Sequence, residues 1–172
     1  MIQIRPERPD NRDGISDVTR KAFGSEEEVD LIIDIRNSEY FVPELSLVAV
    51  EGDMVVGHVM FSKINLETGA GQIPVLSLAP IAVAPEFQKQ GIGIRLVEAG
   101  LEEAARLGYT IVVVIGHPEY YPRFGFTPAR ACGLDIRFEV PDEAFMALGL
   151  VDGALDNVEG IVKFSPPFDK LM

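Results

Sequence analysis

The sequence predicts one α/β domain over residues 1–172, with a mixed β-sheet flanked by helices. Apolar runs of strand length recur along the chain, and a long amphipathic helix pattern follows one of them over 91–107. A continuous β-branched run comes next at 110–115, as is typical of a strand buried on both faces. A strand, a helix and a buried strand in this order predict a parallel βαβ unit.

The first sixty residues are expected to contain one short strand, two helices and a hairpin. Alternating apolar residues predict the strand, and apolar residues at helical spacing predict the helices. Ser25 followed by Glu28 is a capping-box pattern for the second helix. The expected elements are a strand at Ile2–Ile4, helices over 11–23 and 25–36, and hairpin strands over 47–50 and 55–61.

The rest of the chain begins regularly and becomes less regular after Pro122. The clearest helix has Ile94, Val97 and Leu101 on one face, and Gly108 ends it. The expected elements are strands over 73–83, 110–115, 132–140 and 160–164, and helices over 91–107 and 142–148.

The charge of the chain is negative and unevenly distributed. A formal net charge of −12 argues against nucleic acid as a partner, because phosphate binding normally requires a basic surface. Residues 77–137 hold six acidic and six basic residues, so the whole acidic excess lies outside this segment. A polyanionic cofactor can therefore bind in the middle third without opposing the net charge.

The sequence gives no sign of a membrane, an export signal or a metal. No apolar run approaches the roughly 20 residues that span a bilayer, and Arg5 stands where a signal peptide would be apolar, so we expect a cytoplasmic protein. The single cysteine, Cys132, can form neither an internal disulfide nor a multi-cysteine metal site. Nothing in the sequence activates Cys132 as a nucleophile, and we expect a buried strand residue.

A polar loop with two glycines joins the strand that ends near Val83 to the long helix. The first turn of a helix has N–H groups without partners, and their dipoles sum to a partial positive charge. Gly91 and Gly93 let this backbone approach a ligand closely, which predicts a diphosphate site. Neither nucleotide alternative fits. Gly93 is not followed by the Lys-Ser/Thr of a P-loop, and Gly91-Ile92-Gly93-Ile94-Arg95-Leu96 lacks the third glycine of the dinucleotide fingerprint.

This loop resembles the cofactor motif of the GNAT superfamily of N-acetyltransferases. The motif is Gln/Arg-x-x-Gly-x-Gly/Ala, and Gln88-Lys89-Gln90-Gly91-Ile92-Gly93 matches it. The preceding Ile81-Ala82-Val83-Ala84-Pro85-Glu86 is similar to the family's fourth strand and its exit turn. The resemblance implies that acetyl-CoA binds here, with its pantetheine arm on the backbone of Ile81, Ala82 and Val83. It also implies that the pyrophosphate is surrounded by Gln88, Lys89, Gln90, Gly91, Ile92, Gly93, Ile94 and Arg95.

The same resemblance implies the GNAT fold, a mostly antiparallel sheet in which central strands 4 and 5 splay apart to admit the cofactor. Pro80 lies at the position where this splay is expected. Proline cannot donate a hydrogen bond to the strand ladder, so it favours an interruption of the pairing there. The alternative is that residues 73–78 and 81–83 form two unrelated short strands.

A second motif, Gly116-His117-Pro118-Glu119-Tyr120-Tyr121-Pro122-Arg123-Phe124-Gly125-Phe126, follows the buried strand. It is similar to the family's Tyr-x-x-x-Gly-Phe, matched at Tyr121, Gly125 and Phe126, and its wording resembles a bacterial subgroup of uncharacterised predicted N-acetyltransferases. The resemblance implies that Tyr121 stands beside the thioester sulfur as general acid, or as hydrogen-bond donor to the departing thiolate. The alternative is a core tyrosine.

The residue that deprotonates the attacking amine is less well defined by the sequence. Many GNAT enzymes use a glutamate in the fourth strand, whereas residues 76–81 contain no acid. Glu119 is the candidate base, with Glu51, Glu44 and His117 as alternatives. A weak base favours an α-amine of pKa about 8 over a lysine of about 10.4, because deprotonation at pH 7 costs roughly 1.4 against roughly 4.6 kcal/mol.

We therefore expect an acetyl-CoA-dependent N-acetyltransferase that acts on a small-molecule or peptide amine by direct attack in a ternary complex, as a monomer or homodimer. One alternative is a non-catalytic acyl-CoA-binding sensor or regulatory module, and another is an interaction domain without a cofactor. The acid missing from strand four favours the sensor, whereas Tyr121 favours the enzyme. Thioester turnover distinguishes these two, and CoA binding distinguishes both from the third.

Overall fold

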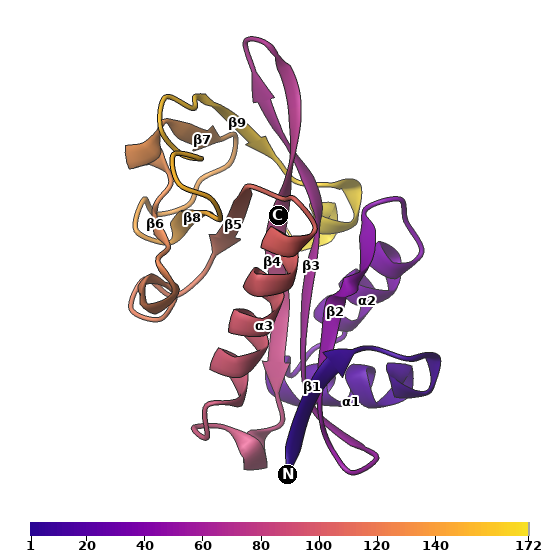
Figure 1. The fold of residues 1–172 in the computed structure, drawn as a ribbon. Helices are drawn as coiled ribbons and strands as arrows, with labels where there is room; N and C mark the ends of the chain where they lie inside the picture. Colours follow the sequence, from indigo (N-terminus) through magenta and orange to yellow (C-terminus); the bar gives the residue numbers. More distant parts are fainter. Residues whose placement is uncertain (172) are drawn as a thin grey trace. The chain divides into compact units, whose positions relative to one another are not determined.

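The structure is a computed structural model that describes residues 1–171 (Figure 1). The helices are α1 (Arg12–Phe23), α2 (Glu27–Arg36) and α3 (Ile92–Arg106). The strands are β1 (Ile2–Pro6), β2 (Phe41–Glu51), β3 (Met54–Thr68), β4 (Gly71–Val83), β5 (Ile111–Ile115), β6 (Thr127–Pro128), β7 (Leu134–Ile136), β8 (Phe145–Gly149) and β9 (Gly160–Lys163). Short 3-10 helices lie at Pro9–Asn11, Pro85–Phe87, Tyr121–Phe124, Arg130–Cys132 and Pro166–Leu171.

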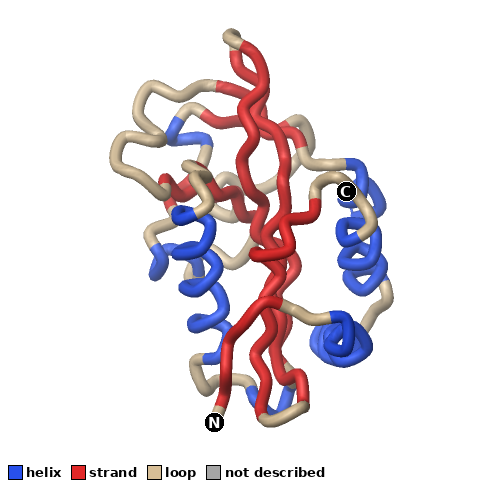
Figure 2. Tube along the Cα trace, turned by 45° about the vertical axis from the view of Figure 1, so that its right-hand side comes forward, coloured by secondary structure: helices blue, strands red, loops and turns tan. Residues whose placement is uncertain are grey.

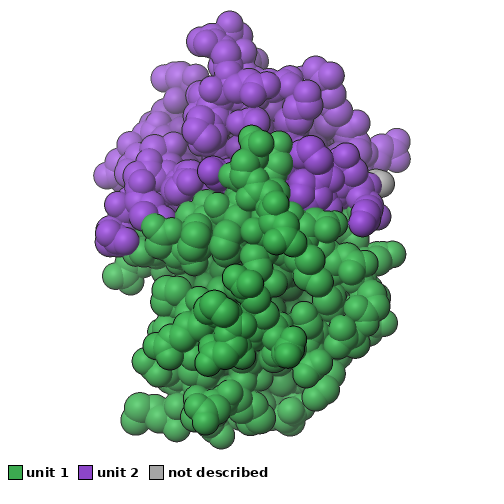
Figure 3. All heavy atoms as spheres, turned by 90° about the vertical axis from the view of Figure 1, so that its right-hand side faces the viewer, with its two compact units in different colours: residues 1–62, 79–103, 171 green, residues 63–78, 104–170, 172 purple. Residues whose placement is uncertain are grey.

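The described residues divide into two compact units (Figure 3). Unit 1 comprises residues 1–62, 79–103 and 171, and unit 2 comprises residues 63–78 and 104–170. The long strands β3 and β4 each contribute to both units, as does α3.

Unit 1 contains antiparallel strands covered on both faces by helices. The strand order is β1-β2-β3-β4, with Ile4 opposite Ala49 and Ala49 opposite Gly57. Helices α1 and α2 lie on one side of these strands, and α3 lies on the other (Figure 2). The core between the layers is apolar, with Ile15, Ile32 and Phe61 almost completely buried.

Helix α3 packs unusually closely on β3, because glycines stand at both surfaces of the contact. A Cβ on Gly57 would lie 3.1 Å from the Cδ1 of Leu96. A Cβ on Gly100 would lie only 2.1 Å from the Cε1 of Phe61. Carbon atoms normally approach to about 3.5–4.0 Å, so a Cβ at position 100 would force Phe61 to shift, whereas a Cβ at position 57 would require Leu96 to give only slightly.

Unit 2 contains the parallel part of the sheet. Its strand order is β7-β9-β3-β4-β5-β8-β6, in which β4 and β5 are parallel and β5 and β8 antiparallel. The register between β4 and β5 comprises Leu76 opposite Val112 and Ser77 opposite Val113, whereas β8 pairs with β5 along all of residues 111–115. A parallel ladder this short agrees with the splay that the GNAT resemblance implies.

The structure confirms the predicted α/β class, the mixed and mostly antiparallel sheet and the parallel β4–α3–β5 unit. Residues 71–83 form one continuous strand that includes the buried Pro80, so the alternative of two unrelated strands is wrong. No helix within residues 1–171 has the length and apolar character needed to cross a bilayer.

Two predictions in the carboxy-terminal third are wrong. The helix expected over 142–148 is instead strand β8, whose Phe145, Met146 and Ala147 are buried against β5. The strand expected over 132–140 is reduced to β7, and Cys132 ends a 3-10 helix as a half-exposed residue rather than a buried strand residue. Met, Ala and Leu favour helix locally, and here pairing with neighbouring strands overrides that preference.

Candidate functional site

The turn between β4 and α3 has a backbone suited to an anion. The strand ends at Val83, a 3-10 turn covers Pro85–Phe87, and the helix begins at Ile92. Lys89 and Gly91 have positive φ values of 65° and 81°, which turn the chain sharply into the helix. The side-chain Nε2 of Gln88 donates to the backbone oxygen of Val83 at 3.0 Å and ties the turn to the strand.

The amino-terminal turn of α3 presents N–H groups that the helix cannot satisfy. The N–H of Arg95 donates to the oxygen of Gly91 at 3.1 Å, so the N–H groups of residues 92–94 precede this bond and have no partner within the helix. A Cβ built on Gly91 would meet no atom within 4 Å, so the space beside this residue is open. Donors of this kind at a helix amino terminus fit a diphosphate.

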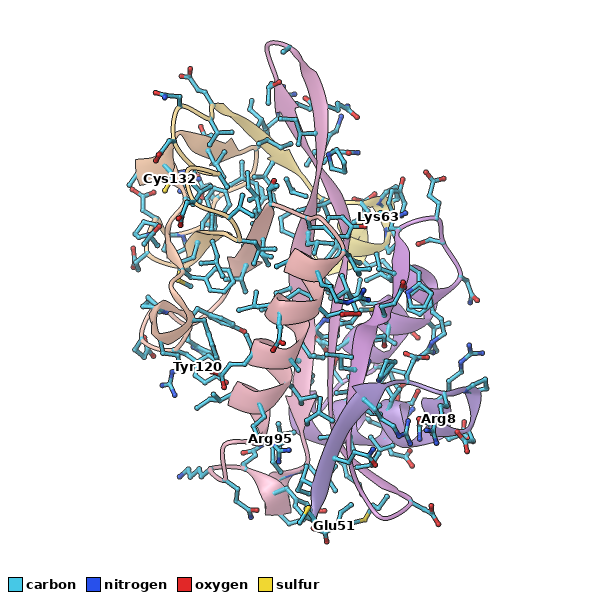
Figure 4. The ribbon with its side chains drawn as sticks, in the orientation of Figure 1. Arg8, Glu51, Lys63, Arg95, Tyr120 and Cys132 are labelled. Atoms are coloured by element: carbon cyan, nitrogen blue, oxygen red, sulfur yellow. The ribbon has the colours of Figure 1, made fainter. Side chains whose placement is uncertain are left out.

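Basic residues flank this turn. Lys89 is exposed. The guanidinium of Arg95, also exposed, donates through Nη2 to the backbone oxygen of Ile2 at 3.1 Å, which holds it at the start of α3 (Figure 4). Ile92 is buried and anchors the turn in the core.

Within unit 1, residues 79–83 of β4 form the last strand of the sheet, next to β3. An edge strand offers a row of backbone donors and acceptors to an extended partner. A pantetheine arm is an extended partner of this kind. The geometry of Ile81, Ala82 and Val83 therefore fits the role that the resemblance implies.

Tyr121 begins a 3-10 helix directly after the β5 exit turn. Only 7% of its surface is exposed. Its N–H donates to the oxygen of His117 at 3.4 Å, and its ring makes edge-on contacts with Tyr120 at 5.1 Å and Phe126 at 5.8 Å between centroids. Aromatic contacts of this geometry fix the orientation of the ring.

Burial raises the pKa of Tyr121 to about 12, and the neighbouring Tyr120 contributes in the same direction. At neutral pH the phenol is therefore protonated and available as a hydrogen-bond donor. Tyr120 itself (Figure 4) is half-buried. The guanidinium of Arg123 lies 4.5 Å from the centre of its ring.

The four candidate bases are all exposed, two in unit 2 and two in unit 1. Glu119 and His117 are exposed in the turn between β5 and Tyr121, and Glu44 and Glu51 are exposed on β2. Ser77, which has the only side-chain hydrogen-bonding group in the stretch where the family usually has its acid, is buried opposite Val113. Within residues 1–171, no group of three or more His, Cys, Asp or Glu side chains is arranged to hold a metal ion.

A buried polar cluster in unit 1 escaped the sequence analysis. Arg36 binds both carboxylate oxygens of Glu7, at 2.9 and 3.1 Å, and the hydroxyl of Ser46 donates to Glu7. The same hydroxyl lies 2.8 Å from Nε2 of the completely buried His58. A histidine and a serine within apolar strand segments were the available signal, because buried polar groups need partners.

Comparison with known proteins now identifies the family. A family model described as "Acetyltransferase (GNAT) domain" matches residues 3–129. The chain belongs to the GNAT acetyltransferase family. It is 33% identical over 168 residues to the uncharacterised N-acetyltransferase YhbS of Escherichia coli strain K12, which covers 97% of this chain and 98% of YhbS. It is 38% identical over 131 residues to YjhQ of the same strain, also an uncharacterised N-acetyltransferase, covering 75% of this chain and 72% of YjhQ.

Two solved GNAT structures share the fold over nearly the whole chain. The crystal structure of E. coli YhbS in complex with CoA superimposes with a TM-score of 0.90, at 33% identity, covering 98% of this chain and 92% of that one. A GNAT acetyltransferase from Brucella melitensis in complex with acetyl-CoA gives a TM-score of 0.80 at 29% identity, covering 98% and 99%. The predicted GNAT fold and family are thereby confirmed, and the predicted site residues remain predictions.

Proposed function

We propose that this GNAT protein transfers an acetyl group from acetyl-CoA to a primary amine, which attacks the thioester directly in a ternary complex. The observation that carries the proposal is the amino terminus of α3, where open N–H groups follow two left-handed residues, Lys89 and Gly91. The relatives support it, since the YhbS structure contains CoA and the Brucella structure contains acetyl-CoA. The relatives YhbS and YjhQ are bacterial proteins, and the single cysteine of this chain cannot form an internal disulfide of the kind found in oxidising compartments, so we assign the reaction to the bacterial cytoplasm.

We assign the cofactor site to the end of β4 and the turn into α3. The backbone of Ile81, Ala82 and Val83 offers an edge for the pantetheine arm. The diphosphate receives N–H groups from the first turn of α3, and Lys89 adds a positive charge. Each contact with the helix dipole contributes only roughly 0.3–1 kcal/mol. Binding of a long ligand therefore requires contacts along the whole of this strand and turn. The assigned pyrophosphate residues are Gln88, Lys89, Gln90, Gly91, Ile92, Gly93, Ile94 and Arg95.

We assign Tyr121 to the leaving group. A C–N bond forms between the amine and the acetyl carbon, the C–S bond breaks, and the thiolate needs a donor. Complete proton transfer from a tyrosine of pKa about 12 to a thiolate, whose thiol has a pKa of about 8.5, is uphill by about 5 kcal/mol. Tyr121 therefore acts as a hydrogen-bond donor whose bond strengthens as charge grows on sulfur, and the thiolate takes its proton from solvent.

The proton lost by the amine goes to Glu119 or to a water that Glu119 orients, and Glu51, Glu44 and His117 are the alternatives. All four side chains are exposed, and residues 76–81 contain no acid. A weak base favours an α-amine or an amino-sugar-like amine over lysine, for the energetic reason given above. Robust acetylation of lysine peptides, with none of α-amines, would refute this substrate class.

The test combines binding with turnover. We expect acetyl-CoA to raise the melting temperature and a panel of amines to release thiol, with Tyr121→Phe retaining the thermal shift but losing turnover by about a hundredfold. Stabilisation without thiol release from any amine would instead indicate the non-catalytic acyl-CoA sensor. Absence of stabilisation at saturating acetyl-CoA would refute the assignment of the β4–α3 turn.

A further inference from the structure

Gly116, the residue directly after β5, lies against the ring of Tyr121. A Cβ built on Gly116 would be 2.5 Å from the Cε2 of Tyr121 and 3.2 Å from its Cδ2. The φ of Gly116 lies outside the left-handed region, so the backbone there does not demand glycine. The close approach of the ring is therefore the feature that excludes a side chain.

Neither partner in this contact is free to move away. The N–H of Gly116 donates to the oxygen of Ala144 at 3.0 Å, and Ile115 pairs with Phe145 in the β5–β8 ladder. The ring of Tyr121 also makes edge-on contacts with the rings of Tyr120 and Phe126. A side chain at position 116 must therefore displace a ring that is already packed.

We propose that Gly116 is a positioning residue for acetyl transfer: the bare backbone at the end of β5 lets the Tyr121 ring lie where its hydroxyl serves the leaving sulfur. This inference rests on the role proposed for Tyr121. An alanine at position 116 forces the ring to move by about 1 Å to recover a normal carbon–carbon separation. A misplacement of about 1 Å can cost up to about a hundredfold in rate.

The test is a double-mutant cycle with Gly116→Ala and Tyr121→Phe, and with Gly69→Ala as the matched control. A Cβ on Gly69 meets no atom within 4 Å, and its φ is also outside the left-handed region. We expect Gly116→Ala to lower kcat between tenfold and a hundredfold, with the KM and thermal shift for acetyl-CoA changed less than twofold. In the Tyr121→Phe background the same substitution should cost less than twofold, because the hydroxyl that it displaces is already absent.

The outcomes separate this inference from the proposed function. If Tyr121→Phe keeps wild-type turnover, the role of the hydroxyl is wrong and the role of Gly116 falls with it. If Tyr121→Phe loses turnover but Gly116→Ala does not, only the positioning role of Gly116 is overturned. The same holds if the loss of kcat in the double variant equals the product of the losses in the two single variants. A merely structural effect would lower the melting temperature and the rate equally in both backgrounds.

A second measurement does not depend on turnover. The chain has four tyrosines, whose rings can be isotope-labelled and observed by NMR. The signal that is missing from the spectrum of Tyr121→Phe is the signal of Tyr121. We expect Gly116→Ala to shift this signal and Gly69→Ala to leave it unchanged. An unshifted Tyr121 signal in Gly116→Ala would overturn the proposal.

Discussion

Acidification should destabilise this protein through His58. The imidazole is completely buried, and its Nε2 lies 2.8 Å from the Ser46 hydroxyl. Burial is the main cause that lowers its pKa from 6.5 to about 4, and Arg36 lowers it further whereas Glu7 opposes the shift. At neutral pH His58 is therefore uncharged within the buried polar cluster that it forms with Glu7, Arg36 and Ser46.

The sign of the effect follows from proton uptake. In the unfolded chain His58 takes a proton near pH 6.5, whereas the folded protein takes it only near pH 4. Between these values the unfolded state binds more protons, so the free energy of unfolding falls as the pH falls. The window of about 2.5 pH units, at about 1.4 kcal/mol per unit, corresponds to a loss of about 3 kcal/mol.

Glu7 acts in the same direction at the acid end of this range. Its burial tends to raise the pKa of the carboxyl, but hydrogen bonds from Arg36 and Ser46 outweigh that effect, and the pKa is lowered below its usual value of 4.5. A lowered carboxyl pKa contributes stability above pH 4.5 that is lost as the pH falls through the folded-state value. The loss from Glu7 therefore begins where the loss from His58 is nearly complete.

Urea unfolding at a series of pH values from 7 to 4 measures the effect. His58→Gln removes the titrating group, so the stability of this variant relative to wild type should rise by about 3 kcal/mol between pH 7 and pH 4. The chain has one other histidine, His117, which wild type and His58→Gln both retain, so the difference between the two proteins isolates His58. Equal pH slopes for wild type and His58→Gln would refute the reasoning.

Two further predictions follow from contacts in unit 1. Gly100→Ala should lower the free energy of unfolding by about 2 kcal/mol, because overpacking against Phe61 outweighs the better helix propensity of alanine; an unchanged urea midpoint would contradict this. Lys89→Gln should raise the Kd for acetyl-CoA about two- to fivefold at low salt, because an exposed ion pair contributes at most about 1 kcal/mol, and the difference should shrink at high salt in a titration monitored by calorimetry.

The turn from β4 into α3 was predictable because its causes are local. Residues 88–93 contain the turn-forming glycines, and the helix that follows has a clear apolar face. A short motif likewise singles out Tyr121, whose role at the thioester stays a prediction. Strand β8 was not predictable in this way, because Phe145–Gly149 becomes a strand only by pairing with β5, some thirty residues earlier.

The buried cluster shows the same limit at the level of side chains. Glu7 meets Arg36 and Ser46 across 29 and 39 residues of chain, and no local pattern reports such contacts. The closeness of Gly116 to Tyr121 escaped the sequence analysis for a different reason. The two residues are near in sequence, but only the folded structure shows that the Tyr121 ring packs back against the backbone of Gly116.

The glycine-mediated contact of α3 with β3 has a consequence for ligand binding. Because Gly57 of β3 makes room for Leu96 of α3, and Gly100 of α3 makes room for Phe61 of β3, the helix packs closely on the strand, which restricts tilting and sliding. The direction of its dipole at the proposed diphosphate site is therefore set during folding, before a ligand binds. A more mobile helix would lose conformational entropy when the ligand binds. Here that entropy is already lost on folding, so tight binding is favoured by preorganisation rather than by additional contacts.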